Sequence, residues 1–165
     1  MNNKGISAVV ATVLIILITV AAITIIWAAV IPMVKNQISS GTTCLDAVSQ
    51  VGLVTEGGYT CITEDGKVQL QISRGAKDFD LAGVQVLVSI GGDTSSYDYL
   101  NSEHSGKELP DSNEERVISV TNTNLDVTSD NLGKATEVSI APIVKVGQTT
   151  ETCDVSATAV LEECA

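Results

Sequence analysis

Four cysteines are the residues whose types and spacing most clearly imply covalent chemistry in this 165-residue chain. All four lie beyond a long apolar segment, at Cys44, Cys61, Cys153 and Cys164. An even number of cysteines in a small domain outside the cytoplasm predicts two disulfides. The successive gaps of 17, 92 and 11 residues do not resemble the spacing of zinc ligands, so we expect no metal site.

The spacing leaves three possible pairings. In two antiparallel strands, facing residues have nearly constant index sums, and Cys44 with Cys164 and Cys61 with Cys153 come closest to that rule. We therefore favour this nested pairing for a sheet in which the first and last strands are neighbours. Sequential pairing, Cys44 with Cys61 and Cys153 with Cys164, is the main rival.

Other polar side chains offer little for catalysis. His104 is the single histidine, and no nucleophile elbow, Walker loop or dinucleotide-binding fingerprint occurs. The acidic groups follow no EF-hand spacing and predict a solvated surface, with incidental divalent-ion binding as the alternative. These groups are Glu64-Asp65, Asp78, Asp80, Glu114-Glu115 and Glu162-Glu163. We expect neither an enzyme nor a cofactor.

Charge is distributed unevenly along the chain. The net charge is −11, with +2 on residues 1–45 and −13 on residues 46–165. Nucleic-acid binding requires lysines and arginines that displace counterions from phosphates. We therefore exclude nucleic acid as a primary partner.

The apolar segment that precedes the cysteines runs from Ile6 to Val34. Its 29 positions are interrupted only by Ser7, three threonines and Pro32. As a helix it would rise about 43 Å, more than the roughly 30 Å hydrocarbon core of a bilayer. The threonine hydroxyls can bond to carbonyls one turn earlier. Such a helix needs apolar surroundings on every side, either lipid or copies of itself.

A short polar leader, Met1–Gly5, directly precedes this segment. The run Lys4-Gly5-Ile6-Ser7-Ala8-Val9-Val10-Ala11-Thr12-Val13-Leu14 resembles the amino-terminal signature of archaeal type IV pilins and archaellin-like subunits. The resemblance covers about 30 residues of the chain. Ala8 stands where many relatives carry Pro, and Val10 stands where bacterial pilins carry a Glu that pairs with a neighbour's terminal amine.

The resemblance implies a class III signal peptide. A prepilin peptidase would recognise Lys4 and Gly5 and cut after Gly5, leaving Ile6 as the first mature residue. The helix would sit in the cytoplasmic membrane before assembly, with its amino terminus cytoplasmic, and then pack among copies in a filament. The expected filament-core residues are Ile6, Ala8, Val9, Val10, Val13, Leu14, Leu17, Val20, Ile23, Trp27 and Pro32.

Pro32 and the polar residues that follow it predict where this helix changes. Pro32 lacks an amide hydrogen, so we expect a kink near Ala28–Ile31. The helix is expected to end near Ile38, with 39–43 as a short hinge. The expected domains are a leader at 1–5, a hydrophobic helix at 6–40 and an extracellular, disulfide-bonded β domain at 41–165.

Short β-like runs follow Cys44. Residues 67–73 alternate apolar and polar with a period of two, and Asp65-Gly66 predicts a hairpin to 59–63. Further strands are expected at 45–55, 84–90, 116–121, 136–146 and 155–161. Residues 91–115 predict a long exposed loop, and Pro142 predicts an edge or a bulge.

These elements predict an α+β chain with a long N-terminal hydrophobic α-helix followed by an antiparallel β-sandwich. The resemblance implies the lollipop-like architecture of pilins. The expected function is a structural subunit of an archaeal type IV pilus-like surface filament for adhesion or cell-surface contact. Its expected partners are copies of itself, the prepilin peptidase and the pilus assembly machinery. Two alternatives are a single-pass membrane-anchored extracellular binding module and a motility-filament (archaellum) subunit.

Overall fold

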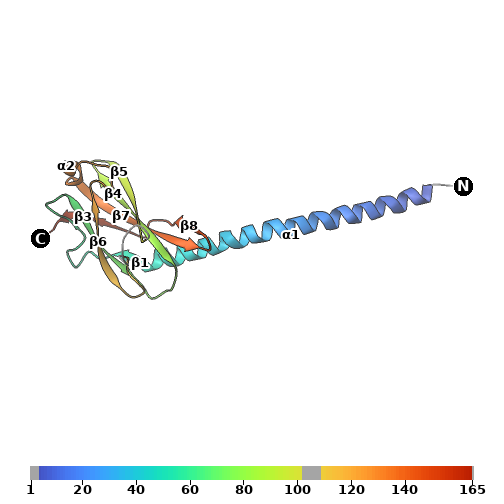
Figure 1. Ribbon diagram of the computed structural model, residues 1–165, viewed down its shortest axis with the longest axis horizontal. Coiled ribbons are helices and arrows are strands. Elements are labelled where there is room, and N and C mark those ends of the chain that lie inside the picture. The colour runs from blue at the N-terminus through green and yellow to red at the C-terminus, as the bar shows by residue number, and fades with distance from the viewer. Residues whose placement is uncertain (1–3, 102–108, 165) are drawn as a thin grey trace. The chain divides into compact units, whose positions relative to one another are not determined.

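The computed structural model describes residues 4–101 and 109–164. The chain divides into two compact units, Met1–Ser39 and Ser40–Ala165. The described part of the first unit, residues 4–39, is helix α1, whereas the second unit contains the end of α1 and the strands (Figure 1). A long apolar helix followed by mostly antiparallel sheets confirms the α+β class.

Helix α1 spans Lys4–Gln50, twelve residues beyond the predicted end at Ile38. The predicted hinge at 39–43 is wrong, and 45–50 is helical rather than extended. The helix also runs through Pro32 without a break. A single glycine, Gly41, costs a helix only about 1 kcal/mol. That cost is offset because Ala47 is fully buried in the second unit, and tertiary packing stabilises a helix more than propensity does.

The first sheet has five strands. These are β1 (Val51–Leu53), β2 (Cys61–Ile62), β3 (Lys67–Arg74), β6 (Glu115–Thr121) and β10 (Glu162–Glu163). Their order is β1-β3-β2-β10, with β6 on the other side of β3. The β10–β2 pair is parallel, which departs from the predicted antiparallel pattern, and the remaining pairs are antiparallel.

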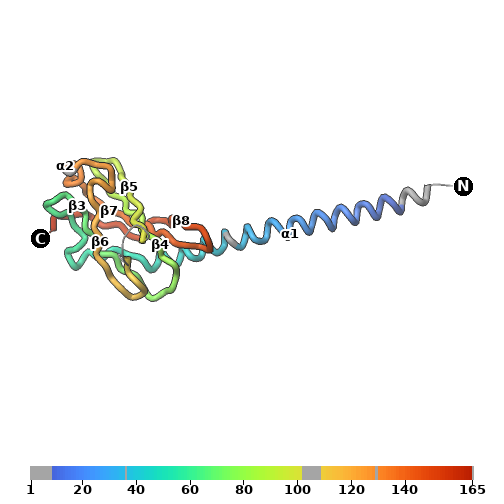
Figure 2. The backbone as a smooth tube through the Cα atoms, in the orientation of Figure 1, coloured from blue at the N-terminus to red at the C-terminus, as the bar shows by residue number. Residues whose placement is uncertain are grey.

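The second sheet also has five strands. These are β4 (Leu81–Ile90), β5 (Asp93–Leu100), β7 (Ala135–Val146), β8 (Thr149–Thr152) and β9 (Ala157–Val160). Their order is β5-β4-β7-β8, with β9 also pairing with β7. A short helix, α2 (Ser129–Leu132), precedes β7, and Figure 2 traces the backbone through all these elements.

Period-two alternation places the core as predicted. Val68, Leu70 and Ile72 on β3 are fully buried, and so are Val84, Val86 and Val88 on β4. These residues join Val138 and Ile140 of β7 in one hydrophobic cluster, so both sheets contribute to the same core.

The predicted hairpin between β2 and β3 is confirmed. Gly66 has φ = 70°, a left-handed conformation that favours glycine. Its N–H donates to the Thr63 carbonyl at 2.9 Å, and Cys61 faces Gln69 across the pair. The predictions for 116–121, 136–146 and 155–161 are also confirmed, as β6, β7 and β9.

The predicted loop at 91–115 is wrong in its first part, because Asp93–Leu100 forms β5. Gly91 and Gly92 both have positive φ and form the two-residue turn between β4 and β5. Tyr99 on β5 is only 4% exposed, and this burial stabilises a strand with a polar sequence. Residues 102–108, which include His104, lie outside the described residues.

Pro142 lies inside β7, not at an edge of the sheet. β7 pairs with β4 on one side, and on the other it pairs with β8 beyond Pro142 and with β9 before it. In an antiparallel strand the N–H and C=O of one residue point to the same neighbour. The Pro142 carbonyl accepts the Cys153 N–H at 2.8 Å, so the missing amide hydrogen faces the interval between β8 and β9. Pro142 has no N–H to return this bond to the Cys153 carbonyl, so the β7–β8 ladder ends there.

Candidate membrane and assembly helix

The apolar part of α1 presents its side chains to the surroundings. The described filament-core candidates from Val9 to Trp27 are each 50–67% exposed, and Pro32 is exposed as well. Candidates in this range are Val9, Val10, Val13, Leu14, Leu17, Val20, Ile23 and Trp27. The side chains of Ile6 and Ala8 lie outside the described residues, although both positions are helical.

The three threonine hydroxyls of this segment donate hydrogen bonds to backbone carbonyls of the same helix. Thr12 donates to the Val9 carbonyl at 2.8 Å, Thr19 to that of Ile16 at 2.9 Å and Thr24 to that of Ala21 at 2.8 Å. These bonds confirm the predicted back-bonding. Apolar surroundings therefore leave none of these three hydroxyl protons without an acceptor.

By length and composition, α1 could cross a membrane. An 18-residue window within Val9–Gln50 has a mean hydropathy of 3.0, with no part of it buried. The segment therefore has the properties of a membrane anchor or a signal sequence.

The residues expected at the cleavage junction lie at the start of this helix. Lys4 is the first residue of α1, and Gly5 and Ile6 follow it. Met1–Asn3 lie outside the described residues. Cleavage after Gly5 stays a prediction.

Both predicted disulfides form, but the pairing is neither the nested one that we favoured nor its sequential rival. Cys44 pairs with Cys153 across a Cα–Cα distance of 5.3 Å, and Cys61 pairs with Cys164 across 5.0 Å. The nested pairing is wrong because the index-sum argument required Cys44 to lie on a strand, and it lies on α1. The sequential pairing is wrong because β10 runs parallel to β2 and brings Cys164 beside Cys61.

Within the second unit, several contacts join the last turns of α1 to β7 and to the connections that follow β3 and β8. Cys44 is bonded to Cys153, and Ala47 packs with Val144 in a second buried cluster. The Asp46 carboxylate forms an ion pair with Lys77. The Gln50 carbonyl accepts the Gly75 N–H at 2.8 Å, and its side-chain oxygen accepts the Lys77 N–H at 3.3 Å.

This attachment of α1 was not predicted from the sequence. A signal was present, since Ser40, Cys44 and Ala47 fall on one helical face at spacings of four and three residues. Residues 39–43 instead predicted a hinge, because a run rich in serine and threonine with a glycine is typical of one.

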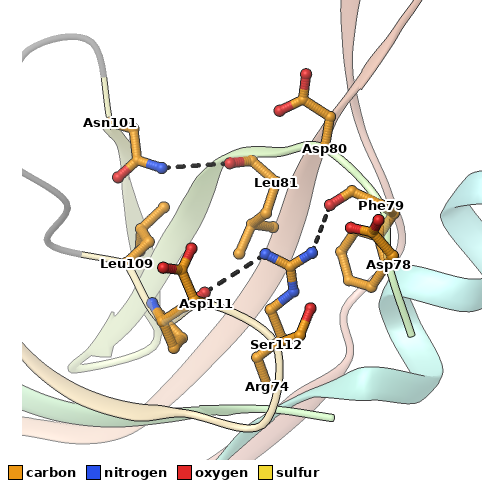
Figure 3. Close-up of a pocket in the computed structure, with 10 residues that line it drawn as sticks. Arg74, Asp78, Phe79, Asp80, Leu81, Asn101, Leu109, Asp111 and Ser112 are labelled. Carbon is orange, nitrogen blue, oxygen red and sulfur yellow. Dashed lines mark hydrogen bonds between the residues drawn. The ribbon is translucent and has the colours of Figure 1, made fainter. Parts of the chain in front are cut away.

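A pocket of about 740 Å³ lies beside the β3–β4 connection (Figure 3). At its base Arg74 is 9% exposed, and its guanidinium donates to the carbonyls of Phe79 and Pro110. The guanidinium carbon also lies 4.4 Å from the centre of the Phe79 ring. On β3 every second side chain, at Val68, Leu70 and Ile72, points into the core, and Arg74 is the next position in this alternation. The alternation could therefore have predicted that Arg74 is buried.

The acidic residues do not converge on a metal site in the described ranges. No group of three or more His, Cys, Asp and Glu there could hold an ion. Glu64 and Asp65 lie near Asp130 and Glu163 around a second, open pocket, whereas Asp78 and Asp80 line the Arg74 pocket.

Comparison with protein-family models, curated proteins and solved structures found no match to this chain. Two disulfides indicate an oxidising, extracytoplasmic environment for the second unit, because such bonds are rare in the cytosol.

Proposed function

We propose that this chain is a structural subunit of an archaeal type IV pilus-like surface filament that serves adhesion or cell-surface contact. The observation that carries the proposal is the apolar helix with its side chains exposed, which continues without a break into a disulfide-bonded β domain. Apolar surface is favourable only when it is removed from water. Lipid would cover this helix before assembly, and identical helices would cover it in the filament.

The β domain suits the outer layer of such a filament. Its two sheets share one core, and we propose that they form a sandwich. Its strongly acidic surface favours solvent over lipid. The contacts of Cys44, Asp46 and Ala47 would transmit an axial pull on the helix to the β domain instead of to a flexible hinge.

Assembly would follow from removal of the leader. Prepilin peptidase would cut after Gly5, and the helix would lose Lys4, its basic contact with the cytoplasmic face of the membrane. Head-to-tail addition of like copies then generates an open helical polymer. The pilus assembly machinery would drive this addition.

Amino-terminal sequencing of the native protein and electron microscopy of sheared surface filaments test the proposal together. We expect a chain that begins at Ile6 in filaments made of this subunit. Gly5→Leu should retain the leader and abolish filaments, whereas Gly41→Ala, a glycine substitution in the same helix, should be cleaved and assembled normally. Filaments built from chains that still begin at Met1 would refute the proposal.

A further inference from the structure

The apolar part of α1 is longer than a bilayer requires. From Ile6 to Val34 it rises about 43 Å against a core of about 30 Å, a surplus of about nine residues. Tilt alone would have to reach about 45° to absorb this surplus, beyond the usual range of helix tilts.

The surplus lies at the outer end of the segment. Trp27 is 21 residues from Ile6, or about 32 Å of helix, which places it at the second interface when Ile6 lies at the first. Tryptophan is enriched at that level of a membrane. The seven residues Ala28–Val34, here called the collar, would then stand above the hydrocarbon and end at the exposed Lys35.

The collar remains apolar and exposed in the single chain. Val30, Met33 and Val34 are 46%, 62% and 44% exposed, and Ile31 is half-buried. With Ile6 at the inner interface, lipid tails would not reach this level, so another apolar surface would be needed to keep the collar out of water.

We propose that the collar binds the collar of a second copy while both chains are still in the membrane. Parallel chains anchored at Ile6 and Trp27 hold their collars at the same height, so the two apolar surfaces meet in register. Ala28 and Ala29 allow the helices to approach closely, and the collar contains no charge that would repel a copy. This inference rests on the membrane stage of the proposed function.

Photo-crosslinking in native membranes tests the proposal. The full chain carries Gly5→Leu, which keeps it in the membrane, and a photoreactive phenylalanine analogue at Met33 or, as the matched control, at Leu17. We expect adducts between differently tagged copies from position 33 and lipid adducts from position 17. Lipid adducts alone from position 33, an adduct to residues 40–165 of the same chain, or equal copy-to-copy adducts from both positions would overturn the proposal.

A second variant removes the collar's apolar surface without removing the anchor. Val30→Gln with Met33→Gln leaves the 22 residues Ile6–Trp27, enough to span a bilayer. With the probe at Ala29, we expect about tenfold fewer copy-to-copy adducts, because two apolar contacts are lost. Ile38→Gln, beyond Lys35, should not change the yield. An unchanged yield from the double variant would contradict the proposal.

The two proposals fail separately. Filaments whose subunits begin at Ile6, without collar adducts in the membrane, would overturn this inference and leave the proposed function standing. Collar adducts in the membrane, together with no filaments from the chain that carries the unaltered Gly5, would overturn the proposed function alone.

Discussion

At the scale of residues, one buried side chain, Arg74, holds two segments of the β domain together. Arg74 is 9% exposed and joins the β3–β4 connection to Pro110 through two backbone carbonyls. Its guanidinium also lies over the Phe79 ring. A charge so buried is retained only where hydrogen bonds and ring contacts offset its desolvation.

Arg74→Met should therefore destabilise the β domain. We expect a loss of about 2–4 kcal/mol in the free energy of unfolding, because both carbonyls lose a charged donor. Lys134→Met, at an exposed lysine, should change it by less than about 0.5 kcal/mol. Urea denaturation of the full chain in mild detergent, followed by circular dichroism, measures both. Equal stability of the two variants would show that the Arg74 contacts contribute nothing.

Alanine should change the free energy of unfolding in opposite directions at two glycines, Gly83 and Gly41. A Cβ at Gly83 would lie 2.6 Å from Leu100 Cδ2 and 2.8 Å from the Tyr99 carbonyl oxygen, so Gly83→Ala should cost about 1–3 kcal/mol. A Cβ at Gly41 meets nothing within 4 Å, so Gly41→Ala should stabilise α1 by about 1 kcal/mol. Thermal unfolding of the full chain in detergent provides the comparison. A neutral Gly83→Ala would mean that β4 and β5 can separate freely.

At the scale of elements, the end of α1 belongs to the β domain. The helix is apolar on all sides up to Val34, yet from Cys44 onward it buries one face against Val144 and Cys153 of the β domain. One helix therefore has two environments, and the disulfide from Cys44 to Cys153 fixes its second part.

Peptide mapping under non-reducing conditions should find the Cys44–Cys153 and Cys61–Cys164 linkages. The expectation follows from the helical position of Cys44 and the parallel pairing of β10 with β2. Detection of Cys44 linked to Cys164, or of four free thiols in native protein, would contradict this structure.

Removal of the first disulfide by Cys44→Ser with Cys153→Ser should loosen the end of α1. The bond closes a sequence separation of 109 residues, so we expect a loss of about 3–5 kcal/mol. Amide hydrogen exchange should increase in residues 44–50 more than in β3 or β4. Protection unchanged at 44–50 would show that Ala47 and Asp46 suffice to hold the helix.

At the scale of the whole molecule, the two units differ in whether they bury their own apolar side chains. Both buried clusters draw their residues from positions 44–161, within the second unit, whereas the described apolar side chains from Val9 to Val30 are exposed. The second unit thus has its own core, and the first needs an external apolar environment.

Residues 40–165, produced in an oxidising compartment, should therefore fold without the rest of α1. We expect a soluble monomer with both disulfides, whereas the full chain should remain with membranes. Size-exclusion chromatography and membrane flotation separate these outcomes. A fragment that aggregates or floats with lipid would show that residues 1–39 are needed for the domain to fold.

Sequence alone determined the features that depend on neighbouring residues. Period-two alternation located β3 and β4, the nearly continuous apolar run defined α1 up to Val34, and the number of cysteines predicted two disulfides. Each of these follows from periodicity or from an even count, which a short stretch of chain carries in full.

The tertiary structure decided where α1 ends, which cysteines pair, that β5 is a strand and that Arg74 is buried. Each of these depends on contacts between residues far apart in the sequence. Ala47 is buried only because Val144 and Cys153 lie beside it, and that packing keeps 39–50 helical despite a local sequence typical of a turn. The Cys44–Cys153 disulfide, the burial of Ala47 and the bonds of Asp46 and Gln50 together outweigh local propensity there, because propensity costs an ordinary residue less than about 1 kcal/mol.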